Sequence, residues 1–99
     1  MERLSLDTCL IRSDETRVCL QDDRIIFLHL KNGLVYTGNA VGARIWGELA
    51  EGHRLGAVAG IVSQAYGISR LLAEEHCLTF GSRLWELGLA TPRSGKVAS

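Results

Sequence analysis

Apolar residues in the first half of the chain alternate with a period of two. Residues 24–30, RIIFLHL, are apolar on both sides of an extended chain, which is typical of a central strand. Asn32-Gly33 follows, and this pair favours the two-residue type I′ hairpin turn, which needs two positive φ angles. Residues 34–37, LVYT, are rich in β-branched and aromatic side chains, as in a returning strand. The pattern therefore predicts a hairpin over residues 24–37.

Weaker strand patterns precede this hairpin. Residues 17–21 form a short candidate strand, and Asp22-Asp23 supplies the turn into the hairpin. Residues 4–11 form a further candidate strand, whose register the sequence leaves open. We expect an N-terminal antiparallel sheet of three strands, with four strands as the alternative.

After residue 39 the apolar period changes to about three and a half residues. Helices are expected over three segments: 40–51, 55–66 and 70–87. Asn39 and Ser69 are suited to cap the first and the third. A glycine follows each segment and favours its termination: Gly52, Gly67 and Gly88. A sheet followed by three helices, the last two joined by a short turn, is an α+β arrangement typical of a winged helix-turn-helix domain.

The third predicted helix has an unusually wide apolar face. On a wheel at 100° per residue its apolar side chains form two stripes, which are Leu71, Leu78, Trp85 and Leu89, and Ala73, Cys77, Phe80, Leu84 and Leu87. Together they span roughly 200°, where a surface helix needs about 100°. Either this helix is sandwiched within its own domain or one stripe lines a groove for a partner, and the wheel leaves both open.

Composition narrows the class of protein. Ninety-nine residues with 46% hydrophobic content suit one domain with one modest core, and eleven acidic residues balance eleven basic ones. This balance argues against a nucleic-acid partner, and no apolar run approaches the ~20 residues of a membrane span. The first residues do not resemble a secretion signal, and three widely spaced cysteines do not suggest disulfides. We expect a cytoplasmic protein with one domain at 1–90 and a flexible tail at 91–99.

Candidate catalytic and metal-binding patterns are sparse. The three histidines, His29, His53 and His76, fall in a predicted strand, a turn and a helix, and no C-x-x-C or H-x-x-x-H spacing occurs. The chain also lacks the G-x-G-x-x-G pattern of a nucleotide-binding loop. We therefore expect no catalytic residue, metal or cofactor. The strand at 34–37 is the better functional candidate, because it runs directly into a helix at a sheet edge that can accept another chain.

Three segments carry a more specific signal. Residues 22–46 read DDRIIFLHLKNGLVYTGNAVGARIW, residues 65–67 read AYG, and residues 84–89 read LWELGL. Their order and spacing resemble the PqqD-like family, the recognition elements for precursors of ribosomally synthesised, post-translationally modified peptides. The resemblance covers residues 17–90, and the N-x-x-G-A-x-I-W pattern beginning at Asn39 is its most specific part. Three positions depart from it, because many relatives carry Asp at His29, Leu at Gly38 and an acidic residue at His76.

The resemblance implies a winged helix-turn-helix domain that binds the N-terminal leader of a precursor peptide. The leader would add as an antiparallel strand to the edge of the third strand and lie against the third helix. The residues implied in binding are the edge strand Leu34, Val35, Tyr36 and Thr37, the groove wall Cys77, Phe80, Gly81 and Leu84, and Arg83 as a partner for an acidic leader residue.

Such a domain delivers the precursor peptide to a separate maturation enzyme. A leader protease of a lasso-peptide pathway is the first expectation, and a radical-SAM enzyme of pyrroloquinoline quinone synthesis is the alternative. Two other classes stay open. A winged-helix DNA-binding regulator would read DNA with the third helix, although Arg70 and Arg83 there are balanced by Glu75 and Glu86. A homodimer would form by pairing of two edge strands.

Overall fold

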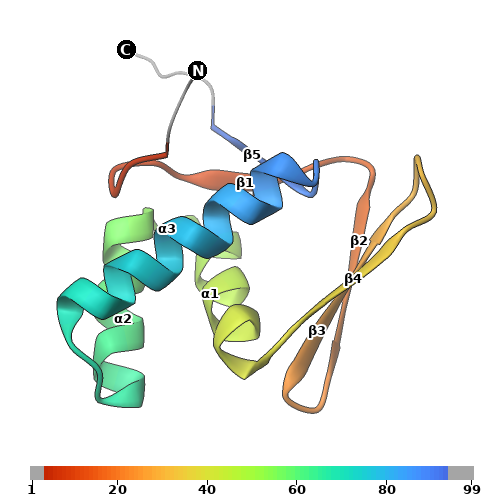
Figure 1. Cartoon of the computed structure of the whole chain (residues 1–99). Coiled ribbons are helices and arrows are strands. Elements are labelled where there is room, and N and C mark those ends of the chain that lie inside the picture. The colour runs from red at the N-terminus through yellow and green to blue at the C-terminus, as the bar shows by residue number, and fades with distance from the viewer. Residues whose placement is uncertain (1–3, 94–99) are drawn as a thin grey trace.

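The computed structural model describes residues 4–93 and has five strands and three helices (Figure 1). The elements are β1 (Leu10–Arg12), β2 (Thr16–Gln21), β3 (Arg24–His29), β4 (Val35–Gly38), α1 (Ala40–Ala50), α2 (Leu55–Tyr66), α3 (Arg70–Glu86) and β5 (Ala90–Pro92). The predicted α+β class, a sheet followed by three helices, is confirmed.

Strands β2, β3 and β4 form one antiparallel sheet with β3 in the centre. The β2–β3 turn consists of Asp22 and Asp23, as predicted, since Gln21 pairs with Arg24. Asp22 has a φ of 56°, a left-handed conformation that aspartate tolerates better than most residues. Ile25 and Phe27 are buried on one face of β3, whereas Ile26 and Leu28 on the other face are half-buried and exposed, so only one of its two apolar faces packs in the core.

The turn between β3 and β4 differs from the prediction. Residues 30–33 form a four-residue loop, in which the Gly33 N–H donates to the His29 carbonyl at 2.8 Å. Gly33 has a φ of +72°, but Asn32 does not have the positive φ that a type I′ turn needs. Instead, the Asn32 side-chain oxygen accepts the Leu34 N–H at 2.9 Å. The type I′ prediction was therefore wrong, because Asn32 lacks the positive φ and its side chain accepts the Leu34 N–H.

The N-terminal strand does not extend the main sheet. β1 pairs with β5 in a separate two-stranded sheet, with Leu10 opposite Pro92 and Arg12 opposite Ala90. The four-stranded alternative is therefore wrong. Thr91 and Pro92, predicted within a tail, belong to β5, where pairing with β1 orders them. The rest of that predicted tail, from residue 94, lies outside the described residues.

The helix boundaries follow the predicted caps. The Asn39 side chain accepts the Gly42 N–H at 3.0 Å, and the Ser69 side chain accepts the Leu72 N–H at 3.1 Å. Gly67 terminates α2 with a φ of +65°. These local signals place the starts of α1 and α3 and the end of α2 at their predicted positions.

The core lies between the inner face of the sheet and the helices, with α3 crossing α1 and α2 (Figure 1). Ile25 and Phe27 of β3 are buried, and the Phe27 ring meets the Trp46 ring edge-on at a centroid distance of 5.0 Å. This contact ties α1 to the sheet. Since β4 runs directly into α1, the same contact also holds β4 in place.

Candidate functional site

Strand β4 is an open edge of the main sheet in the described part of the chain. It is hydrogen-bonded to β3 only, with Tyr36 opposite Phe27 and Val35 opposite Leu28. The His29 N–H donates to the Leu34 carbonyl at 3.0 Å, which marks this pair as a hydrogen-bonded one. Hydrogen-bonded and non-hydrogen-bonded pairs alternate in antiparallel sheets. The N–H and C=O groups of Val35 and Thr37 therefore point away from β3, toward any strand that adds to this edge.

One flank of α3 lies beside this edge, and Phe80 is the residue of that flank that reaches it. The Phe80 ring reaches the junction of β4 and α1, and its Cε1 lies 3.8 Å from the position that a Cβ would take at Gly38. The same atom lies 3.0 Å from the corresponding position at Gly42. Only glycine at residue 42 leaves this space for the ring. Gly38, a position that departs from the family pattern described above, likewise leaves room for Phe80 and for Ile25, whose Cγ2 lies 2.9 Å from the Cβ position.

Three residues predicted in the groove wall are buried. Cys77 and Leu84 belong to the hydrophobic core, and a Cβ at Gly81 would lie 3.1 Å from Leu10 Cδ1, on the core side of the helix. Burial raises the pKa of the Cys77 thiol to about 11, which Arg70 opposes and Glu74 reinforces. Cys77 is consequently a neutral thiol at physiological pH. These three positions therefore lie in the core, behind the flank of α3 that contains Phe80.

The flank of α3 that faces β4 contains His76, Phe80, Arg83 and Leu87, which follow each other at helical spacing. Phe80 and Leu87 are half-buried against the core, whereas Arg83 and His76 are exposed. Tyr36 of β4 is half-buried opposite them, since alternation places it on the inner face of the sheet. Leu87 was missed in the predicted set, although its spacing of seven residues from Phe80 places both on one flank.

His29 lies at the end of the sheet closest to the C-terminus of α3. Its Nε2 is 3.2 Å from the position of a Cβ at Gly88, the glycine with a φ of +75° that follows the helix. Its Nδ1 is buried and has no hydrogen-bond partner among the described residues. His29 is thus a half-buried polar side chain on the inner face of the sheet.

Residues 4–93 contain no group of three or more His, Cys, Asp or Glu side chains able to hold a metal ion. No helix among them is long and apolar enough to cross a membrane.

The fold and the site together define a winged helix-turn-helix domain whose sheet has an open edge beside its last helix. The chain belongs to the PqqD family, since the family model described as coenzyme PQQ synthesis protein D (PqqD) matches residues 24–90. The predicted family resemblance is confirmed. No curated protein sequence matches this chain.

Two solved structures share the fold. One is TbiB1 in complex with the TbiA(beta) leader peptide, with a TM-score of 0.76 and 29% sequence identity, covering 88% of this chain and 98% of that one. The other is lasso peptide synthetase B1 complexed with the leader peptide, with a TM-score of 0.79 and 26% identity, covering 85% of this chain and 99% of that one. This chain is therefore similar, over nearly all of both chains, to two proteins solved with leader peptides.

Proposed function

We propose that this protein is a non-catalytic module that binds the leader segment of a ribosomally synthesised precursor peptide. The observation that carries the proposal is the likeness of its whole fold to two leader-peptide complexes. The open edge of β4, beside the flank of α3 that contains Phe80, supplies a place for such a segment.

The geometry suggests how the leader binds. An extended peptide adds antiparallel to β4 through the backbone groups of Val35 and Thr37, and these bonds tolerate many sequences. Its inward side chains then contact Tyr36, Phe80 and Leu87, which supply selectivity. Arg83, exposed on the same flank, attracts an acidic residue of the leader. Of the predicted binding residues, those with accessible groups on this surface are retained in the proposal, and Cys77, Gly81 and Leu84 act by supporting it.

The partner that receives the bound precursor is a maturation enzyme. We favour a leader protease of a lasso-peptide pathway, because one similar structure is named as lasso peptide synthetase B1. A chaperone for a radical-SAM enzyme of pyrroloquinoline quinone synthesis is the second candidate, supported by the description of the family model. The two are distinguished by adding the chain to each candidate enzyme and measuring which one processes its precursor faster.

Leader binding is tested by titrating the chain into fluorescently labelled leader peptide from a short precursor reading frame found next to that of the chain. We expect saturable binding that Phe80→Asp abolishes, because the carboxylate replaces the apolar ring at the junction of β4 and α1. Leu71→Asp is the control, since Leu71 lies on α3 with 77% of its surface exposed. Equal affinities of both folded variants for the leader would refute the proposed site. Salt-sensitive binding of duplex DNA in place of the leader would favour the DNA-binding class.

A further inference from the structure

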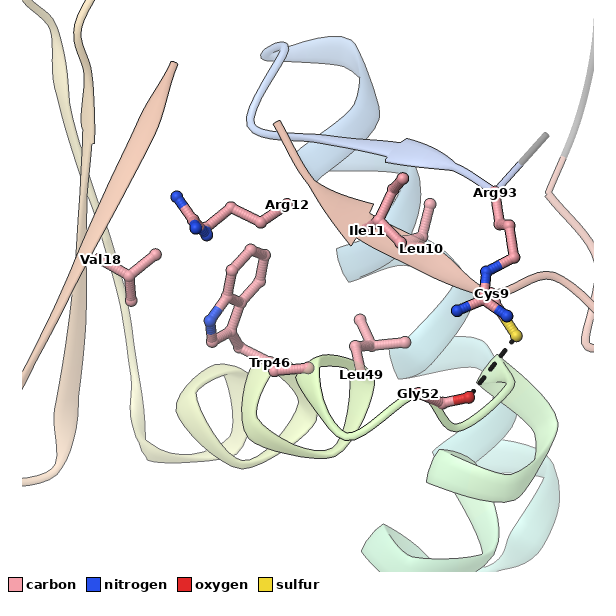
Figure 2. A pocket seen from close by; sticks show the side chains of 10 residues that line it. Cys9, Leu10, Ile11, Arg12, Val18, Trp46, Leu49, Gly52 and Arg93 are labelled. Carbon is pink, nitrogen blue, oxygen red and sulfur yellow. Dashed lines mark hydrogen bonds between the residues drawn. The ribbon is translucent and has the colours of Figure 1, made fainter. Parts of the chain in front are cut away.

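A hollow lies between β1, β2 and α1 (Figure 2). Its volume is about 270 Å³. Trp46 and Leu49 of α1 form its floor and are only 8% and 3% exposed, so the core holds them in place. Ile11 and Val18 add apolar side chains from β1 and β2. The hollow is thus a fixed apolar surface large enough for one or two side chains.

Two arginines flank this apolar floor. Figure 2 shows Arg12 above the indole of Trp46 and Arg93 at the opposite end, beside Cys9. No Asp or Glu lines the hollow, and neither arginine has a carboxylate within ion-pair distance among residues 4–93. One nitrogen of Arg12, Nη1, donates to the Thr16 carbonyl at 2.6 Å, which orients the guanidinium and leaves its other N–H groups for a ligand.

A second, adjoining hollow shares Arg12 and also contains more basic than acidic residues. That hollow is lined by Arg12, Arg17 and Val18, with Asp14 as its one acidic residue. Guanidinium groups bind carboxylates through paired hydrogen bonds, and the apolar floor favours a neighbouring aliphatic or aromatic side chain. A nucleic-acid phosphate would satisfy the arginines, but it would leave the floor formed by Trp46 and Leu49 uncovered.

The hollow is separate from the leader site. Val18 belongs to β2, which is one edge of the main sheet, whereas the leader is proposed to add to β4 at the other edge. β3 lies between them, so both sites are available at the same time. A module that holds a peptide at one edge therefore has a second surface free for another protein.

We propose that this hollow is a docking site for a segment of a partner protein that carries an apolar side chain next to a carboxylate. Trp46 and Leu49 contact the apolar side chain, Arg12 above the indole binds the carboxylate, and Arg93 adds positive charge at the other end of the hollow. Binding of such a segment in the hollow does not depend on whether the chain binds a leader. Assigning the segment to the maturation enzyme rests on the proposed function.

Binding in the hollow can be measured through the reactivity of Cys9. Its thiol lies in the lining, 3.7 Å from the Gly52 carbonyl (Figure 2), and is half-buried. Cys77 is buried, and the exposed Cys19 is removed by Cys19→Ser, so Cys9 becomes the reactive thiol of the full chain. The rate of its alkylation by a maleimide is measured with increasing amounts of two blocked tripeptides, N-acetyl-Leu-Glu-Leu-amide and the matched N-acetyl-Leu-Gln-Leu-amide.

We expect the Glu peptide to slow the alkylation of Cys9 at about tenfold lower concentration than the Gln peptide, because only the former has a charge for the arginines. Arg12→Gln should remove this difference. Equal protection by the two peptides, or no protection by either, overturns the proposal. Protection by mixed-sequence DNA at physiological salt but not by the Glu peptide also overturns it, in favour of a nucleic-acid surface.

A parallel experiment separates this site from the leader site. Saturating leader peptide should leave the alkylation rate of Cys9 unchanged, and Arg12→Gln should leave the affinity for the leader unchanged. Protection of Cys9 by the leader itself would overturn the inference of two separate sites. Failure of the leader to bind at all, with the Glu peptide still protecting Cys9, would refute the proposed function and leave the docking site standing.

Discussion

The ring of Phe80 packs so closely against Gly42 that a Cβ at this position would make a tight contact with it. Cε1 of the ring lies 3.0 Å, and Cζ 3.3 Å, from that position. Contact between the last helix and the first residues of α1 therefore depends on the absence of one side chain. This relationship connects the family pattern N-x-x-G-A-x-I-W, in which Gly42 stands, to the surface proposed for the leader.

Gly42→Ala should weaken leader binding by about tenfold, because the new methyl group displaces the Phe80 ring and overpacking of this kind costs about 1–3 kcal/mol. The affinity for labelled leader is measured for both proteins. Gly47→Ala is the matched control, since nothing lies within 4 Å of a Cβ at that position of the same helix. The control should keep the affinity and gain up to about 1 kcal/mol in stability. If Gly42→Ala leaves the affinity for the leader unchanged, the position of the Phe80 ring does not matter for leader binding.

Proline substitutions along β4 should have opposite consequences at neighbouring residues. Thr37→Pro removes an N–H that faces the open edge, so leader affinity should fall by about tenfold while the melting temperature changes little. Tyr36→Pro removes an N–H that bonds to β3, so it should lower the melting temperature. Circular dichroism and the leader titration together distinguish the two effects. A full loss of folding in Thr37→Pro would show that its N–H is used within the sheet.

The free energy of unfolding should decrease as the pH rises from about 9 to about 11. The pKa of Cys77 is raised from 9.0 to about 11 in the folded protein, so the unfolded chain releases its thiol proton first and is favoured over that interval. The full effect corresponds to about 3 kcal/mol. Urea unfolding of Cys77→Ala should lack this component, whereas Cys19→Ser should retain it. Parallel pH profiles for the original protein and Cys77→Ala would contradict the assignment.

His29→Phe should raise the free energy of unfolding by about 1 kcal/mol, because an apolar ring replaces a buried nitrogen that has no partner among the described residues. The measurement is urea unfolding at neutral pH. His53→Phe, at an exposed turn residue, is the control and should change little. A marked loss of stability in His29→Phe would mean that Nδ1 makes a hydrogen bond that the ring cannot replace.

Local signals in the sequence predicted most of the secondary structure. Three kinds of signal each act within a few residues, so they can be recognised before the fold is known. They are the alternation in residues 24–30, the caps at Asn39 and Ser69, and the glycine at 67. β5 was not predicted, because Ala90–Pro92 is short and contains proline, and it exists only by pairing with β1, about eighty residues earlier.

The site was predicted less completely than the fold. A helical wheel gives the angle between Cys77 and Phe80, but it does not say which neighbour each one meets. The structure places the buried arc of α3 around Cys77 and Leu84, and leaves Phe80 at its border toward β4. The hollow at Trp46 could not be predicted from the sequence either, because its residues come from β1, β2 and α1, which are brought together only by the fold.

The pairing of β1 with β5 has a consequence for how this domain is combined with others. The first and last described strands are paired with each other, away from β4 (Figure 1). The described chain therefore begins and ends at neighbouring places on the domain. A second protein joined through either end would start from the same point of the surface. Fusion to an enzyme, in nature or by design, therefore joins the enzyme at a place away from the open edge of β4.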